Sequence, residues 1–336
     1  AARGEASPPS TTRPASPRGP FASYLLVLHN VREERRYLYA RYYELFWDVW
    51  ESRAPGRGPC DPVRGNCVSA CNTATCLAGI FGSLDSLKGP APAGALWIHA
   101  DMWINPGLFP IERLDGRKVW ITDSGLLLRW HAVDKNNDTI KDPNGNPKWM
   151  EQEVPNRCLE GEELYGHFLE TGNWFTTPLP DHRPTATNRA PFLDQGLQIL
   201  RRPEVQALPA LRNWGQNRLC FGWVDILYIP YHVWPDWRQL TSYFGSVFHE
   251  VAAYTMLNML VRSGRAPGVE TIDFCEGNCC HTQAPKAILT SPCGHKMNLI
   301  NDDVRDIFEG VLRMYKATEK ANRSGSASRL PRLGRL

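Results

Sequence analysis

The sequence lacks the features that mark several large classes of protein. It contains no run of about 20 apolar residues that could cross a membrane as a helix, and no signal peptide. It also contains no C-x-x-C pair, the spacing common in structural zinc sites and redox motifs. Because the chain begins with Ala, we expect it to be a processed part of a longer protein, with a targeting segment or membrane anchor upstream.

The folded part of the chain also lacks the positive charge that nucleic-acid binding needs. The formal net charge is +3, but the first 20 residues carry +2 and the last 20 carry +4, which leaves −3 for residues 21–316. A nucleic-acid-binding domain needs a basic face that can displace counterions from phosphates. The charge balance therefore argues against a nucleic-acid partner.

Cysteine, in contrast, is plentiful. There are ten cysteines in two clusters with two single residues between them, at positions 60, 67, 71, 76, 158, 220, 275, 279, 280 and 293. An even number predicts disulfides, up to five of them, whose connectivity the sequence leaves open. The alternative is a zinc site, which the spacing of adjacent cysteines disfavours; its candidate ligands are Cys275, Cys279, Cys280, His281, Cys293 and His295.

Disulfides indicate an oxidising compartment, so we expect the Golgi or ER lumen or the extracellular space. Two glycosylation sequons, at Asn137 and Asn322, fit a secreted glycoprotein.

The composition divides the chain into three parts. Residues 1–20, rich in Pro, Ser, Arg and Ala, predict a disordered stem, and residues 317–336 predict a disordered basic tail. Residues 21–316 predict a single catalytic domain with a sizeable core. Apolar runs predict strands over residues 24–28, 95–98, 118–121 and 223–229, and apolar stripes predict helices over residues 33–51 and 240–262. This pattern is typical of an α/β domain with a mostly parallel sheet flanked by helices.

Residues 134–147 offer oxygen ligands at alternating positions, as a calcium loop does. Thr139 stands where such a loop needs glycine, so an exposed hairpin tip rich in Asn and Asp is the favoured interpretation.

The strongest candidate for a functional site comes directly after the strand over residues 95–98. His99 and Asp101 stand at its carboxyl end, and residues i and i+2 of an extended strand share a face. Because open α/β sheets bind ligands outside the carboxyl ends of their strands, both side chains could reach one cation. The alternative is a core histidine and an aspartate that caps a turn.

This strand, the His99–Asp101 pair and the subsequent Trp103-Ile104-Asn105-Pro106 resemble the Asp-x-Asp element of GT-A-fold glycosyltransferases. In that family the element holds a divalent cation against the diphosphate of a nucleotide sugar. The resemblance implies a GT-A-like (Rossmann-like) fold and a manganese or magnesium cofactor. His99 replaces the first carboxylate of the pattern, and imidazole suits manganese better than magnesium.

The same resemblance implies a late metal ligand at His295, with Lys296 near the diphosphate. Residues 222–230 resemble a strand near the acceptor region, where Trp223 offers a stacking face, as Trp234 and Trp237 do. Glu250 lies on an apolar helix, where burial would raise its pKa as a general base requires. Asp225 is the alternative base, and a structural ion pair is the alternative role for Glu250.

Together these features predict a metal-dependent, inverting glycosyltransferase that moves a sugar from a nucleotide-sugar donor to a glycan or glycoprotein acceptor. Two other functions remain open. One is a secreted hydrolase that uses the same metal ligands to activate water. The other is a non-catalytic, disulfide-rich binding protein.

Overall fold

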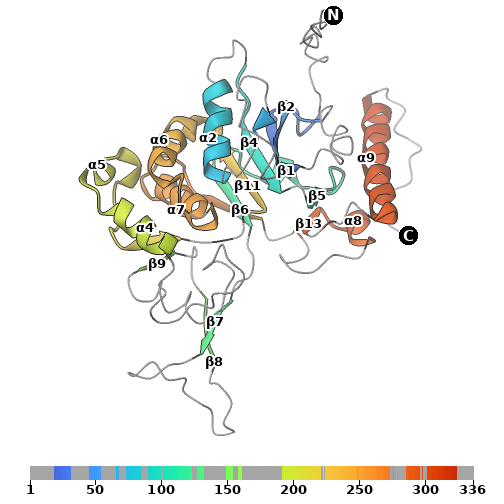
Figure 1. Cartoon of the computed structure of the whole chain (residues 1–336). Coiled ribbons are helices and arrows are strands. Elements are labelled where there is room, and N and C mark those ends of the chain that lie inside the picture. The colour runs from blue at the N-terminus through green and yellow to red at the C-terminus, as the bar shows by residue number, and fades with distance from the viewer. Residues whose placement is uncertain are drawn as a thin grey trace, which may run out of the picture.

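The structure is a computed structural model (Figure 1). It describes residues 19–31, 45–53, 66–67, 73–84, 90–99, 101–122, 127–131, 149–153, 158–160, 191–220, 222, 224–247, 249–272, 275, 285–295, 297 and 301–323. The predicted calcium-like loop, most of the first cysteine cluster and residues 1–18 lie outside these ranges.

A seven-stranded sheet forms the centre of the molecule. Its strands, in spatial order, are β12 (Val269–Ile272), β6 (Val119–Thr122), β11 (Ile226–Pro230), β4 (Gly94–His99), β1 (Tyr24–Val31), β2 (Asp48–Arg53) and β3 (Asn66–Cys67). Among these strands β11 alone is antiparallel to its neighbours, so the sheet is mostly parallel, as predicted. The strands predicted over residues 24–28, 95–98 and 118–121 are confirmed, and the fourth begins at Ile226.

Successive side chains of the strands enter two separate cores, one on each face of the sheet. Leu25, Val27 and Trp97 pack into the first core, whereas Leu26 and Leu96 pack into the second. This is the alternation expected of a strand whose two faces are both covered. The strands therefore read as continuous apolar runs in the sequence.

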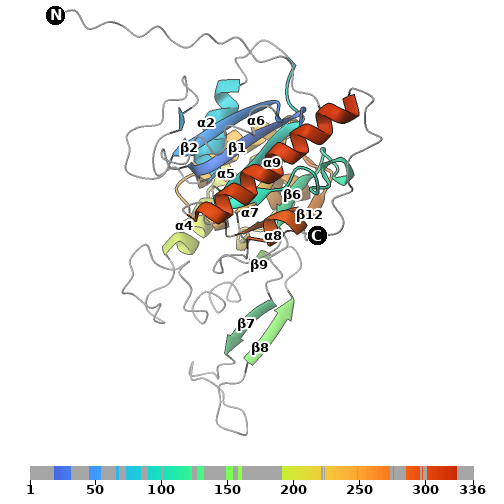
Figure 2. The same cartoon turned by 90° about the vertical axis from the view of Figure 1, so that its right-hand side faces the viewer.

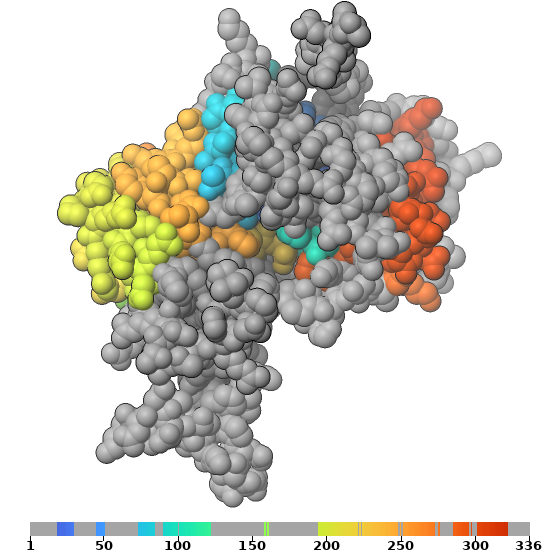
Figure 3. Space-filling view, viewed as in Figure 1, coloured from blue at the N-terminus to red at the C-terminus, as the bar shows by residue number. Residues whose placement is uncertain are grey.

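Helices cover the first face, and two helices with a small sheet cover the second (Figures 1 and 2). The first layer consists of α2 (Thr73–Leu84), α4 (Pro191–Leu200), α5 (Pro203–Gln206), α6 (Trp234–Phe244) and α7 (His249–Arg262). The second layer consists of α8 (Ala287–Thr290), α9 (Asp302–Arg323), β5 (Met102–Ile104) and β13 (Cys293–His295). The space-filling view shows α9 and the first helical layer on opposite sides of the molecule (Figure 3).

Shorter elements complete the described chain. They are the antiparallel pairs β7 (Leu127–His131) with β8 (Trp149–Glu153) and β9 (Cys158–Glu160) with β10 (Arg218–Cys220), and the 3-10 helices η3 (Ile111–Arg113), η6 (Pro209–Leu211) and η7 (Tyr231–Val233). The β7–β8 pair projects from the body in both views (Figures 1 and 2).

Disulfides join parts of the chain that are distant in sequence. Cys158 is bonded to Cys220 across the β9–β10 pair, and Cys275 is bonded to Cys293 at the start of β13. Cys76 is also disulfide-bonded. The predicted disulfides are thus present, and the second bond removes Cys275 and Cys293 from the alternative zinc site. None of the helices within the described ranges is both long and apolar enough to span a membrane.

Three predicted boundaries are wrong. The helix predicted over residues 33–51 extends too far, because β2 begins at Asp48. Val49 and Trp50 pack into opposite cores of the sheet, as successive residues of a strand do. The helix over residues 240–262 is two helices, α6 and α7. The predicted tail begins too early, because α9 continues to Arg323.

Candidate metal centre

The candidate site lies at the carboxyl ends of the central strands β1 and β4, next to the start of β11. His99 is the last residue of β4, and it pairs in register with His29 of the parallel strand β1. On the other side, the backbone N–H of His99 donates to the carbonyl oxygen of Asp225 at 2.7 Å, just before β11 begins. The sheet therefore places His29, His99 and Asp225 in one row.

This row lies at the position where the strand order reverses. Strand β1 has β2 on one side and β4 on the other, and all three are parallel. In open α/β sheets the crevice outside the carboxyl ends of such neighbouring strands is the usual ligand site. His29 and His99 stand at that end of β1 and β4.

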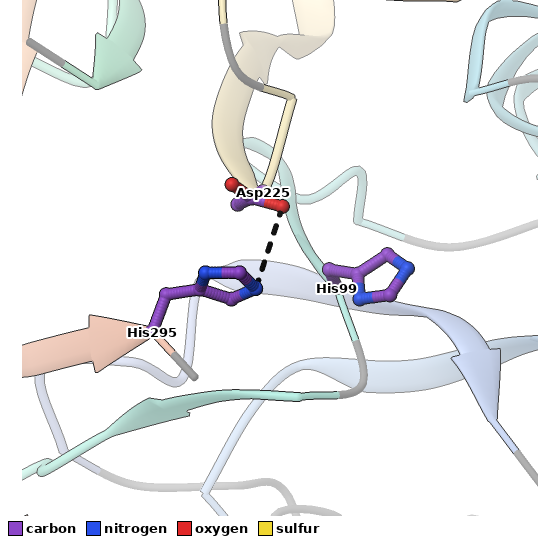
Figure 4. Close-up of side chains that lie close together, drawn as sticks. All are labelled: His99, Asp225 and His295. Atoms are coloured by element: carbon purple, nitrogen blue, oxygen red, sulfur yellow. Dashed lines mark ion pairs between the residues drawn. The ribbon is translucent and has the colours of Figure 1, made fainter. Parts of the chain in front are cut away.

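The small β5–β13 sheet brings two further residues to the same place. Asp101 stands between β4 and β5, and His295 ends β13, opposite Met102 in the antiparallel pair. Four side chains then converge, which we call the metal-site cluster: His99, Asp101, Asp225 and His295. Figure 4 shows His99, Asp225 and His295 close together on separate elements, with His295 directed toward Asp225.

The atoms of the cluster are close enough to share one cation. His99, Asp225 and His295 each offer a ligand atom within 4.8 Å of the other two. The Nε2 atom of His295 is 3.9 Å from Oδ1 of Asp225 and 3.1 Å from Oδ1 of Asp101. The same Asp101 oxygen also contacts Nδ1 of His99. Asp101 therefore joins the two imidazoles directly.

Burial and hydrogen bonding oppose each other at Asp101. Partial burial would raise the pKa of its carboxyl, but the hydrogen bonds from His295 and His99 outweigh that effect and lower the pKa well below its usual range. Asp101 is thus a carboxylate at neutral pH. It can fix the ring of His99 through Nδ1, which leaves Nε2 of that ring for a cation, whereas it meets His295 at Nε2, the nitrogen that also faces Asp225.

Two more histidines surround the cluster on the α7 side. The ring of His29 stacks on Trp97 at 4.5 Å and meets the ring of His99 edge-on at 5.4 Å. Burial, together with the nearby His99 and His249, holds the pKa of His29 well below its ordinary value. Burial, together with the smaller effect of His99, lowers the pKa of His249 to about 4. Both imidazoles are therefore neutral at neutral pH.

The chemistry of these side chains fits a divalent transition metal. Neighbouring ligand atoms around a cation with bonds of about 2.1 Å lie about 3.0–3.4 Å apart. Nε2 of His295 and Oδ1 of Asp225 lie 3.9 Å apart, so these two ligand atoms would have to move closer together to coordinate one cation. Mixed imidazole and carboxylate ligands favour manganese, cobalt or zinc over magnesium or calcium.

The structure brings together four of the residues predicted from the sequence. His99, Asp101 and His295 lie in contact, and Asp225, predicted as an alternative base, lies beside them. Glu250 is in the first turn of α7, directly after His249, but its side chain lies outside the described residues, as do Trp223 and Lys296. Trp234 and Trp237 are fully buried in the first core and offer no face to a sugar.

Sequence reasoning did not find His29 and His249 as neighbours of the site. His29 comes directly after the apolar run over residues 24–28, so the strand-end rule that identified His99 also applied to it. His249 gave no signal of its own, because only the packing of α7 against the sheet brings it near His99.

A cavity of about 370 Å³ lies elsewhere, between residues 105–113 and α9. None of the metal-site cluster lines it. It is thus separate from the candidate metal centre.

Comparisons with known proteins give no further guide to the site. No protein-family model, no curated protein and no solved structure matches the chain.

Proposed function

We propose that the protein is a divalent-metal-dependent glycosyltransferase that uses a nucleotide-sugar donor. The observation that carries the proposal is the convergence of His99, Asp101, Asp225 and His295 at the carboxyl edge of β1 and β4. The strand order there supports a nucleotide site, and the His99–Asp101 pair supports the likeness to the Asp-x-Asp element of GT-A enzymes. A GT-A-like fold is part of the same proposal.

In this proposal His99, Asp225 and His295 hold the cation. Asp101 orients the ring of His99 through Nδ1, and Nε2 of His295 would turn from Asp101 to the cation when the metal binds. A bound divalent cation would offset the negative charge that develops on the leaving diphosphate. Lys296, next to His295 in the chain, would add a second positive charge, and Trp223 would stack on the donor. The acceptor is a glycan or glycoprotein.

Glu250 would act as the general base. Its carboxylate would take the proton of the acceptor hydroxyl while that oxygen attacks the anomeric carbon. The bond from the anomeric carbon to the diphosphate breaks at the same time, and its electron pair leaves with the diphosphate. Attack opposite the leaving group inverts the anomeric configuration. Its neighbour His249 supports this role, because the pKa of His249 responds to His99 and the first turn of α7 therefore lies beside the cluster.

The disulfides support a secretory location. Cys158–Cys220, Cys275–Cys293 and the bonded Cys76 would persist in the Golgi or ER lumen or outside the cell. A nucleotide-sugar donor and a glycoprotein acceptor would meet in the Golgi or ER lumen.

The test is calorimetric titration of the full chain with Mn²⁺ and then with UDP. We expect Mn²⁺ to bind, UDP to bind more tightly when Mn²⁺ is present, and Asp225→Asn to abolish both effects. Asp236→Asn is the matched control, since Asp236 is a partly buried carboxylate that pairs with Arg265 at 2.8 Å and lies outside the metal-site cluster.

Two outcomes would contradict the proposal. If the parent chain binds no Mn²⁺, the metal centre is wrong. If it binds Mn²⁺ but UDP binding is the same with and without the metal, a metal-dependent hydrolase becomes the better interpretation, and hydrolysis of ester substrates should then be assayed.

A further inference from the structure

The strand that carries His295 has little sheet around it. Within the described residues, β13 pairs with β5 in an antiparallel sheet of two strands. A two-stranded ribbon is marginally stable by itself in water. The position of His295 therefore depends on whatever fixes this ribbon to its surroundings.

Asn105 provides one such attachment, at the end of the ribbon away from Asp101. Its backbone N–H donates to the carbonyl oxygen of Pro292 at 2.8 Å, which extends the ladder by one residue beyond Cys293. Its side-chain Nδ2 donates to the carbonyl oxygen of Ile288, the second residue of α8, at 3.1 Å. The side chain is buried, with 6% of the residue exposed, so water does not replace these bonds.

The Asn105 side chain also fixes its own turn. Its Oδ1 accepts the backbone N–H of Gly107 at 3.1 Å. One amide thus uses its donor on the segment before β13 and its acceptor on the segment after β5. This arrangement holds the two segments at a set distance.

The Cys275–Cys293 disulfide provides the second attachment. Cys293 pairs with Ile104 in the ribbon, is fully buried, and is separated from His295 by one residue of β13, Gly294. The bond ties the first residue of β13 to the segment that comes after β12. Past His295, the backbone N–H of Met297 donates to the carbonyl oxygen of Asp101.

We propose that Asn105 and the Cys275–Cys293 disulfide are positioning elements for the metal centre: they hold β13 so that His295 meets Asp101, Asp225 and His99. This inference rests on the proposed metal site. It assigns a role to the Asn of the Trp103-Ile104-Asn105-Pro106 segment and to a disulfide, neither of which contacts the cation. It predicts that both control metal affinity as well as stability.

The experiment compares two disulfides in the full chain. One variant is Cys275→Ala with Cys293→Ala, and its matched control is Cys158→Ala with Cys220→Ala, which removes the disulfide between β9 and β10. A third variant is Asn105→Ala. For each, the Kd for Mn²⁺ is measured by calorimetry and the midpoint of thermal unfolding by circular dichroism.

We expect the Kd for Mn²⁺ to rise about 10- to 100-fold in the Asn105 and Cys275/Cys293 variants, the range for loss of groups that orient metal ligands. The Cys158/Cys220 control should unfold at a lower temperature and keep the parent Kd within about twofold. Should the Cys275/Cys293 variant fail to fold, Asn105→Ala decides the matter.

The inference is overturned if the folded variants bind Mn²⁺ as tightly as the parent. It is also overturned if the control loses as much affinity as they do, since the effect would then depend on stability alone. A parent chain that binds no Mn²⁺ overturns the proposed metal site itself, and with it this role.

Discussion

Asp101 contacts two imidazoles. A carboxylate in a metal centre can either orient a histidine ligand or bind the cation itself, and Asp101 and Asp225 differ in this respect. One oxygen of Asp101 meets both Nδ1 of His99 and Nε2 of His295. A carboxylate that orients histidines contributes less to metal affinity than one that binds the cation itself. Asp225 stands farther from His295, at 3.9 Å, which leaves room for a cation between the two side chains.

We therefore expect Asp101→Asn and Asp225→Asn to differ in strength. Asp101→Asn should raise the Kd for Mn²⁺ about 10- to 100-fold, because the amide oxygen still accepts a hydrogen bond from Nδ1 of His99 but has no charge to hold that ring in place. Asp225→Asn should leave no measurable binding. Calorimetry on both variants checks this, and equal losses would make Asp101 a direct ligand.

Glu250 carries a further prediction at this scale. If it is the base, Glu250→Gln should lower turnover about 10²- to 10⁴-fold while the donor still binds, because only the proton acceptor is removed. If it is half of a buried ion pair, the same change should lower stability by about 3–5 kcal/mol with near-normal specific activity. A transfer assay and a thermal melt on this one variant separate the two roles.

At the site, the residues that a single strand brings together were predictable from the sequence, and those that the tertiary fold brings together were not. His99 and Asp101 could be paired because strand periodicity places residues i and i+2 on one face. Asp225 joins them because β11 is inserted antiparallel between β4 and β6, which no local pattern specifies. The sequence therefore predicted Asp225 as an alternative base and did not indicate that it lies beside His99 and His295.

Among the elements, α9 is the one whose importance the sequence concealed. Its polar and basic residues made residues 317–336 look like a tail, but residues 317–323 continue α9, a helix whose Phe308, Val311 and Leu312 recur at helical spacing and pack into the second core. The charged residues occupy the other face of the helix, as in any amphipathic helix. Composition alone could not distinguish the two cases.

Truncating a side chain on the buried face of α9 should therefore cost stability. Leu312→Ala should lower the free energy of unfolding by about 2–5 kcal/mol, because Leu312 is fully buried and its loss leaves a cavity. Its neighbour Arg313 is exposed, so Arg313→Ala should change stability by less than about 0.5 kcal/mol. Urea denaturation measures both, and equal effects would show that Leu312 does not pack into the second core.

A glycine lies at the break between α6 and α7, which the apolar stripe spans. Gly245 lies so close to the rest of the chain that a Cβ atom there would be 2.7 Å from the carbonyl oxygen of Thr241 and 3.1 Å from Oγ1 of Thr75. A larger residue would not fit at this position, where the end of α6 approaches α2. α7 then begins at His249, with its first residue beside the metal-site cluster.

At the scale of the whole molecule, the sequence predicted a mostly parallel sheet of buried strands, and the structure contains one. The order of the strands in the sheet could not be predicted from the sequence. Apolar runs predicted buried strands because β1, β4 and β6 are covered on both faces. The β5–β13 pair joins residues separated by most of the domain, and the two strands are too short for a periodic signal. That is why His295 could be proposed as a partner of Asp101 only by resemblance.

The disulfides give a last prediction that tests the molecule as a whole. Mass mapping without reduction should find Cys158 linked to Cys220, Cys275 linked to Cys293, and Cys76 in a further bridge. Cys158–Cys220 spans 62 residues and Cys275–Cys293 spans 18, so in the chain-entropy account they stabilise the fold by about 4 and about 3 kcal/mol. Reduction should accordingly lower the unfolding temperature, and the longer loop should account for more of the loss. Labelling of these cysteines by a thiol reagent in the native, unreduced protein would contradict both the connectivity and the oxidising compartment inferred from it.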